Sequence, residues 1–287
     1  MLDGESPLFR RLVVVLDDLA PWQGAFAHDW AWRLHAPIHV ICPPWIRTGK
    51  AGINGEDAEG SLTERTEWLG AGAQASAELG VACEVHEWDD NALTGLRRFL
   101  DVGDLCIISH TLPLAHKRFV IQQTRRCETP ALLVCSRSYA PLSRILLLCS
   151  GKSPNELFLN KAVQLCRAFG AWPVVLSVAN SERAAQQLQQ AARETLASYD
   201  LRCDFDFLVG PDVGAAAASV ARWRGCQLVV MEQQTAPAWL RWLRGDPLER
   251  LIGFMEPLNL LALPEVGVPV ARSNLVRTAP ASVKSIH

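Results

Sequence analysis

The chain contains 287 residues, of which 49% are hydrophobic and 20% are charged, and its formal net charge is -2. This share of apolar residues excludes an intrinsically disordered chain, and the nearly balanced charge excludes the basic surface with which proteins bind nucleic acid. No run of about 18 apolar residues is present, so we expect no membrane-spanning segment. The acidic start lacks the apolar run of a secretory signal, which predicts a cytoplasmic protein.

In chain order, strands and helices alternate through residues 11–135. Apolar or alternating runs predict strands at residues 11–17, 37–42, 81–88 and 129–135. Helical spacing predicts helices at residues 21–35 and 62–79, and residues 91–109 combine a helix, a glycine stop and a buried strand. This order is typical of parallel strands joined by helical crossovers.

The same order returns in residues 144–263. Strands are predicted at residues 144–150, 172–178, 201–209 and 257–263, helices at residues 154–169 and 183–199, and a helix, glycine stop and strand at residues 212–231. We therefore predict an α/β fold of two tandem doubly wound (Rossmann-like) domains, with mainly parallel five-stranded sheets, packed as a pseudo-dimer. The predicted domains are residues 1–139 and residues 140–287, the second including a C-terminal tail.

The duplicated element order, with Asp17 ending the first strand and a long loop and short helix after the fourth, resembles the universal stress protein family in its tandem form. The resemblance covers nearly the whole chain. It implies a role in stress response and, in members that bind ATP, an Asp-Gly-Ser-like turn after the first strand. After the fourth strand such members carry Gly-x-x-Gly, about nine residues, and then Gly-Ser or Gly-Thr, where backbone amides and a helix N-terminus hold phosphate.

The second half departs from that glycine pattern. Glu232 and Thr235 stand where the first two glycines are expected, and Gly245 of the later pair is followed by Asp246 where the family has a hydroxyl residue. Asp246 also begins the sequence Asp-Pro-Leu-Glu, which predicts a self-capped helix start. Two like charges about 4 Å apart cost about 4 kcal/mol at an effective dielectric constant near 20, which predicts the loss of ordinary ATP affinity.

The first half departs further, because its loop at residues 110–120 contains no glycine. Lys117 and Arg118 near the start of the next helix could attract an anion, although surface basic residues are more often simply solvated. After the first strand, Asp17 keeps the family's aspartate, whereas the second half has Ser150 followed by Gly151. If a nucleotide binds, the resemblance implies that Asp17, Gly151, Gly245 and Asp246 contact it.

We expect no metal site. The nine cysteines include no C-x-x-C pair, which predicts reduced and buried thiols. His28, His35 and His39 lie close in sequence, but their spacing crosses an element boundary and no nearby carboxylate or cysteine completes a ligand set, which favours histidines without a metal.

Trp239 and Trp242 are separated by one helical turn, which favours packing between the two domains over a lid or a partner-binding patch. Without an assigned acid, base or nucleophile, an enzyme is the least favoured reading. We therefore predict a non-catalytic, regulatory universal-stress-type protein with a degenerate nucleotide site and no cofactor, binding a protein partner or a small molecule; a homodimer is compatible with the sequence. The alternative is an ATP-binding stress protein with slow hydrolysis at a divergent site.

Overall fold

The structure, a computed structural model, describes residues 7–15, 21–43, 80–87, 92–135, 140–151, 154–233 and 258–264. In the first half it contains β1 Leu12–Val15, α1 Pro21–Leu34, β2 Ile38–Cys42, β3 Cys83–Glu87, α4 Ala92–Phe99, β4 Leu105–Ser109, α5 Leu114–Arg126 and β5 Ala131–Val134. In the second half it contains β6 Arg144–Ser150, α6 Glu156–Phe169, β7 Trp172–Ala179, α7 Glu182–Ala197, β8 Asp204–Val209, α8 Val213–Arg224, β9 Leu228–Gln233 and β10 Asn259–Pro264.

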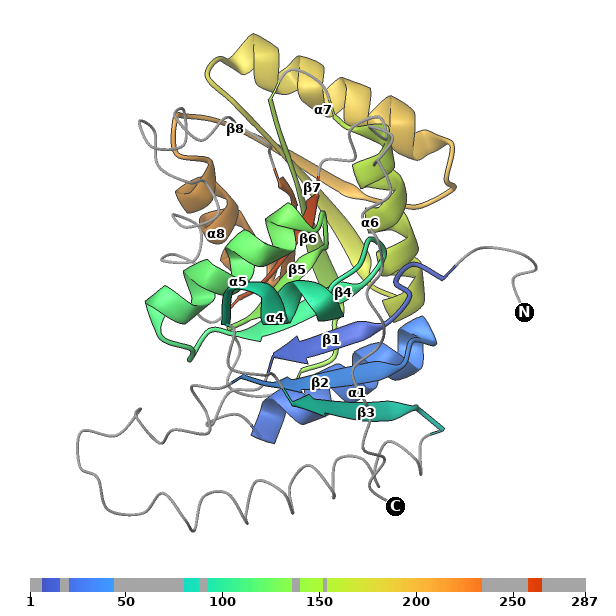
Figure 1. The fold of residues 1–287 in the computed structure, drawn as a ribbon. Coiled ribbons are helices and arrows are strands. Elements are labelled where there is room, and N and C mark those ends of the chain that lie inside the picture. The colour runs from blue at the N-terminus through green and yellow to red at the C-terminus, as the bar shows by residue number, and fades with distance from the viewer. Residues whose placement is uncertain are drawn as a thin grey trace, which may run out of the picture.

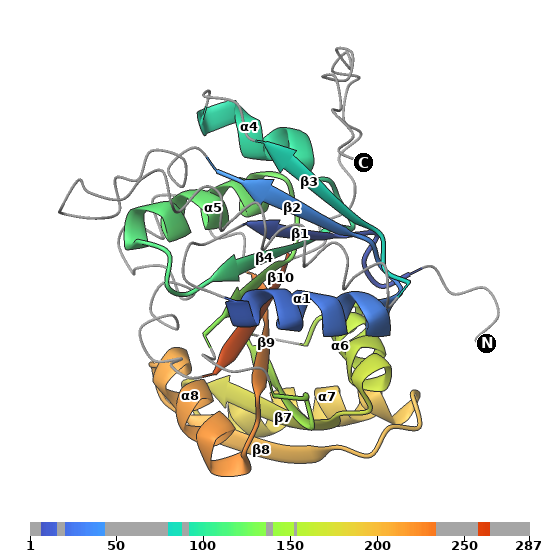
Figure 2. The same ribbon diagram turned by 90° about the horizontal axis from the view of Figure 1, so that it is seen from below.

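All of these strands belong to one ten-stranded sheet, in the order β3-β2-β1-β4-β5-β10-β9-β6-β7-β8. Read outward from the centre, both halves have the same five-strand order, and strands within each half pair in parallel. The predicted α/β fold with a mainly parallel sheet is confirmed, and each half contributes five strands. Figure 2 shows the outermost strands, β3 and β8, at opposite ends of the molecule.

The two five-stranded sheets are joined into one, which the sequence pattern did not predict. β10 pairs with β5 in the antiparallel sense, with Leu261 opposite Leu132, while its other edge pairs in parallel with β9. Both central strands are buried. The join therefore covers two strand edges that would otherwise expose unpaired backbone groups. The predicted domain boundary near residue 139 lies outside the described residues.

Helices cover both faces of the sheet (Figure 1). Buried side chains of α1, α6 and α7 form one hydrophobic core with one face, and buried side chains of α4, α5 and α8 form a second core with the other face. Adjacent residues of β1 alternate between these cores, Val14 facing the first and Val13 and Val15 the second, as the geometry of a strand requires. None of the described helices is long and apolar enough to cross a bilayer.

Trp30 of α1 connects the two halves. Its indole is fully buried, stacks on Phe26 with ring centroids 5.4 Å apart, and meets Phe169 of α6 at 4.8 Å. The tryptophans that the sequence assigned to packing between the domains, Trp239 and Trp242, lie outside the described residues. An aromatic contact between the halves therefore comes from α1.

Candidate functional site

The strand order contains two switch points, between β1 and β4 in the first half and between β6 and β9 in the second. At such a point the connections leave the sheet in opposite directions, and doubly wound proteins bind ligands at the carboxyl ends of those strands. β1 leads into residues 16–20, which lie outside the described residues. At the second switch point, Gly151 follows β6 and Glu232 lies near the end of β9.

Gly151 is the one nucleotide-contact residue implied by the family resemblance that the structure describes. Its φ angle is +107°, a backbone conformation that side chains rarely adopt, and among the described residues an added Cβ atom would meet nothing within 4 Å. The backbone of the turn after β6 therefore favours glycine here. Asp17, Gly245 and Asp246, the other residues of that set, lie outside the described residues.

Asn155 and Glu232 are hydrogen-bonded to each other at the second switch point. Asn155 is the N-cap of α6, and its side-chain oxygen accepts hydrogen bonds from the backbone N–H groups of Leu157, at 3.0 Å, and Phe158, at 3.4 Å. The Asn155 Nδ2 group donates to Glu232 Oε1. The Asn155 side chain thus caps the start of α6, and the Glu232 carboxylate lies beside it.

The charge of Glu232 also reaches Cys149, which lies on β6. Burial raises the pKa of the Cys149 thiol to about 12, and the negative charge of Glu232 acts in the same direction. Because only a thiolate is a strong nucleophile, Cys149 stays a protonated, unreactive thiol at neutral pH. Burial likewise lowers the pKa of Lys161, on α6.

Replacing Asn155 by alanine is expected to cost about 2 kcal/mol of unfolding free energy, because the N-cap and the hydrogen bond to a carboxylate are both lost. Ser181→Ala is the matched comparison, since Ser181 caps α7 through the Ala184 N–H at 3.3 Å and is exposed. Its expected cost is about 1 kcal/mol. Urea denaturation of both variants tests the difference, and equal costs would show that the bond to Glu232 contributes nothing.

At the first switch point, polar groups of the loop after β4 bond to each other. The hydroxyl oxygens of Ser109 and Thr111 lie 2.5 Å apart, and Lys117 Nζ donates to the backbone oxygen of His110 at 2.6 Å. Pro113, the N-cap of α5, makes no side-chain capping bond. The ammonium group of Lys117, one of the two candidate anion ligands, thus bonds from α5 to the loop that precedes this helix; anion binding by Lys117 and Arg118 stays a prediction.

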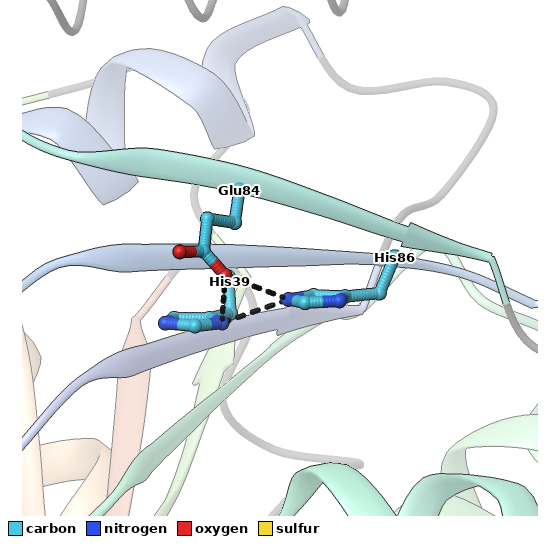
Figure 3. A group of neighbouring side chains, drawn as sticks. All are labelled: His39, Glu84 and His86. Atoms are coloured by element: carbon cyan, nitrogen blue, oxygen red, sulfur yellow. Dashed lines mark hydrogen bonds and ion pairs between the residues drawn. The ribbon is translucent and has the colours of Figure 1, made fainter. Parts of the chain in front are cut away.

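The sequence interpretation missed a second group of polar side chains. His39 of β2 lies beside Glu84 and His86 of β3, three residues whose ligand-type atoms all fall within 4.8 Å of one another (Figure 3). His28 and His35, the other members of the rejected histidine set, are not in this group. The alternation of β3 places Glu84 and His86 on one face, but only the pairing of His39 with Glu84 across the strands brings all three together.

Comparison with solved structures identifies the fold. A universal stress protein from Archaeoglobus fulgidus DSM 4304 matches with a TM-score of 0.63 at 13% identity, over 90% of this chain and 98% of that chain. A putative universal stress protein from Pseudomonas aeruginosa UCBPP-PA14 matches with a TM-score of 0.61 at 17% identity, over 89% and 93%. The cytoplasmic domain of a prokaryotic cation chloride cotransporter matches with a TM-score of 0.58 at 10% identity, over 88% and 95%.

These likenesses confirm the expected resemblance to universal stress proteins at the level of the fold, over about nine-tenths of the chain. No protein-family model matches the sequence, and no curated protein matches it.

Proposed function

We propose that this chain, whose fold is that of the universal stress proteins, acts in stress response by binding a protein partner or a small molecule, and that it catalyses no reaction. The observation that carries the proposal is the hydrogen bond between Glu232 and Asn155 at the second switch point. Glu232 stands where ATP-binding members of the family are expected to have a phosphate-binding glycine. The helix start beside it is already capped by Asn155.

The physical argument is competition between a carboxylate and a phosphate. A helix N-terminus attracts an anion because its first N–H groups are unpaired, and here the amides of Leu157 and Phe158 already have a partner. A phosphate placed about 4 Å from the Glu232 carboxylate would meet a repulsion of about 4 kcal/mol at an effective dielectric constant near 20. That repulsion corresponds to a loss of about three orders of magnitude in affinity.

Two further observations support a binding role. The protonated state of Cys149 removes one nucleophile from this position. The same fold also forms the cytoplasmic domain of a cation chloride cotransporter, so it serves in proteins with unrelated overall activities.

Native mass spectrometry of the full chain with Mg-ATP at millimolar concentration tests the proposal. We expect no stoichiometric ATP adduct on the wild-type protein. Glu232→Gly restores the glycine and removes the charge, and we expect it to bind ATP at least tenfold more tightly than the wild type. Glu194→Gln, an exposed position on α7, is the control for the loss of one negative charge.

A stoichiometric ATP adduct on the wild-type protein would overturn the proposal and favour the alternative, an ATP-binding stress protein with slow hydrolysis. Hydrolysis would then be measured as phosphate release. A different small molecule retained through purification would support the proposal and identify the ligand class.

A further inference from the structure

We propose that His39, Glu84 and His86 form a binding site for a divalent transition-metal ion of the Zn²⁺ type, at the β3 edge of the sheet. The site is independent of the proposed function, because it involves neither switch point. Two imidazoles and one carboxylate are a ligand set of zinc sites that keep an open coordination position.

The distances fit a single ion. His39 Nδ1 and His86 Nε2 are 2.8 Å apart, and each lies 3.6 Å from Glu84 Oε2. A point equidistant from three atoms so spaced lies about 2 Å from each of them, and a Zn–N bond is about 2.0–2.1 Å long. Figure 3 shows the three side chains pointing toward one another from two adjacent strands.

The facing nitrogens of the two imidazoles need a hydrogen atom or a cation between them. Their rings lie edge to edge, with an interplanar angle of 2° and centroids 5.1 Å apart, so the two facing nitrogens point at each other. Two lone pairs cannot face each other at this distance, so either a shared N–H proton or a cation lies between them. Without metal, one ring donates to the other.

Metal binding changes the tautomer of one imidazole but releases no proton from the two rings. The donating ring must transfer its proton from the facing nitrogen to its far nitrogen, after which both facing nitrogens present lone pairs to the ion. Each ring also turns toward Glu84, and rotation of a histidine ring about χ2 is soft. The two rings remain neutral, and the Glu84 carboxylate supplies the negative charge.

An ion can reach the three side chains from solvent. The Glu84 side chain is 63% exposed, which leaves an approach for the ion from solvent, while His39 and His86 are 16% and 20% exposed.

The second half of the chain provides an internal comparison. Matching segments lie at the two edge strands: CEVH, residues 83–86, begins β3, and CDFD, residues 203–206, starts one residue before β8. In β8 the two aspartates are neutralised by Arg224 of α8, which binds Asp206 at 2.6 and 2.8 Å and Asp204 at 4.0 Å. At this edge of the sheet the carboxylate charges are therefore balanced by an arginine of the same half.

The first half replaces this arrangement with histidines. His86 stands where β8 has Asp206, and His39 stands in the register position that Val174 occupies in β7. Phe99, the last residue of α4, contacts His86 with ring centroids 5.2 Å apart. A cation held by Glu84 and the two imidazoles does at β3 what Arg224 does at β8.

Zinc titration of the full chain, stripped with a chelator and dialysed, tests the proposal. We expect one equivalent of Zn²⁺ to bind the wild-type protein by isothermal titration calorimetry. Glu84→Gln and His86→Gln are each expected to weaken binding at least tenfold. His35→Asn is the matched control, because His35 is exposed and asparagine tolerates its positive φ of 51°.

Two spectroscopic measurements separate this site from binding by cysteine. The Co²⁺-loaded protein should lack the near-ultraviolet band of a thiolate ligand, and ¹⁵N shifts of the histidine side chains should change at His39 and His86 and not at His35. Circular dichroism would check that His86→Gln is folded. If it is not, the variant Glu84→Gln, at an exposed position, tests the site by itself. Absence of stoichiometric binding, a thiolate band, or full affinity in both variants would overturn the proposal and leave a hydrogen-bonded histidine pair.

Discussion

Trp30→Ala is expected to lower the free energy of unfolding by about 3–5 kcal/mol, because it removes a fully buried indole from the contact between α1 and α6. The cost combines the lost transfer free energy of the ring with the cavity left between Phe26 and Phe169. Guanidinium denaturation followed by circular dichroism measures the loss.

Two further substitutions test whether burial of the Trp30 indole accounts for the lost stability. Trp32→Ala on the same helix removes an indole that is 55% exposed, and we expect it to cost less than about 1 kcal/mol. Trp30→Phe keeps a smaller aromatic ring and removes Nε1, a buried N–H group that has no hydrogen-bond partner among the described residues. Because losing this group offsets part of the cost of the smaller ring, the expected cost is about 1–2 kcal/mol. Equal costs for Trp30→Ala and Trp32→Ala would show that the α1–α6 contact does not stabilise the fold.

Asp104→Ala is expected to cost about 3 kcal/mol, because it leaves the guanidinium of Arg11 without its carboxylate. Asp104 is fully buried at the start of β4, and its Oδ2 atom accepts hydrogen bonds from Arg11 Nε at 2.9 Å and from the Asp101 backbone N–H at 2.8 Å. The pair connects the residue before β1 to the residue before β4, its neighbour in the sheet.

Arg10→Ala is the control for this second prediction. Arg10 and Asp101 form an ion pair at 3.3 Å with side chains 60% and 45% exposed, and we expect its loss to cost less than about 1 kcal/mol. The double variant Arg11→Met with Asp104→Leu replaces both charges by apolar groups, and we expect it to recover most of the loss. Thermal unfolding of the single and double variants measures this recovery; a double variant no more stable than Asp104→Ala would contradict the ion-pair explanation.

Hydrophobic periodicity predicted most elements and their order. Residues 11–17 and 144–150 are predicted as buried strands, and the structure has β1 and β6 there; residues 16 and 17 lie outside the described residues. The predicted helices at residues 154–169 and 183–199 correspond to α6 and α7. These predictions succeed because burial imposes a repeat of two on strands and 3.6 on helices, and both repeats are local.

The candidate sites were predicted less completely. The family pattern singled out Glu232 and Gly151, but not Asn155, although an asparagine before an apolar helical run is a typical N-cap signal. The pattern carries no information on which side chain the Glu232 carboxylate contacts. That contact joins residues 77 positions apart.

The sequence by itself determined the repeated strand and helix order and the residue substitutions at the second switch point, because each depends on neighbouring residues. Only the tertiary structure decided that β5 and β10 pair, that Trp30 meets Phe169, and that His39 meets Glu84 and His86. Each of these depends on strand register or helix packing between distant segments, where a shift of one residue would turn His39 to the opposite face of the sheet.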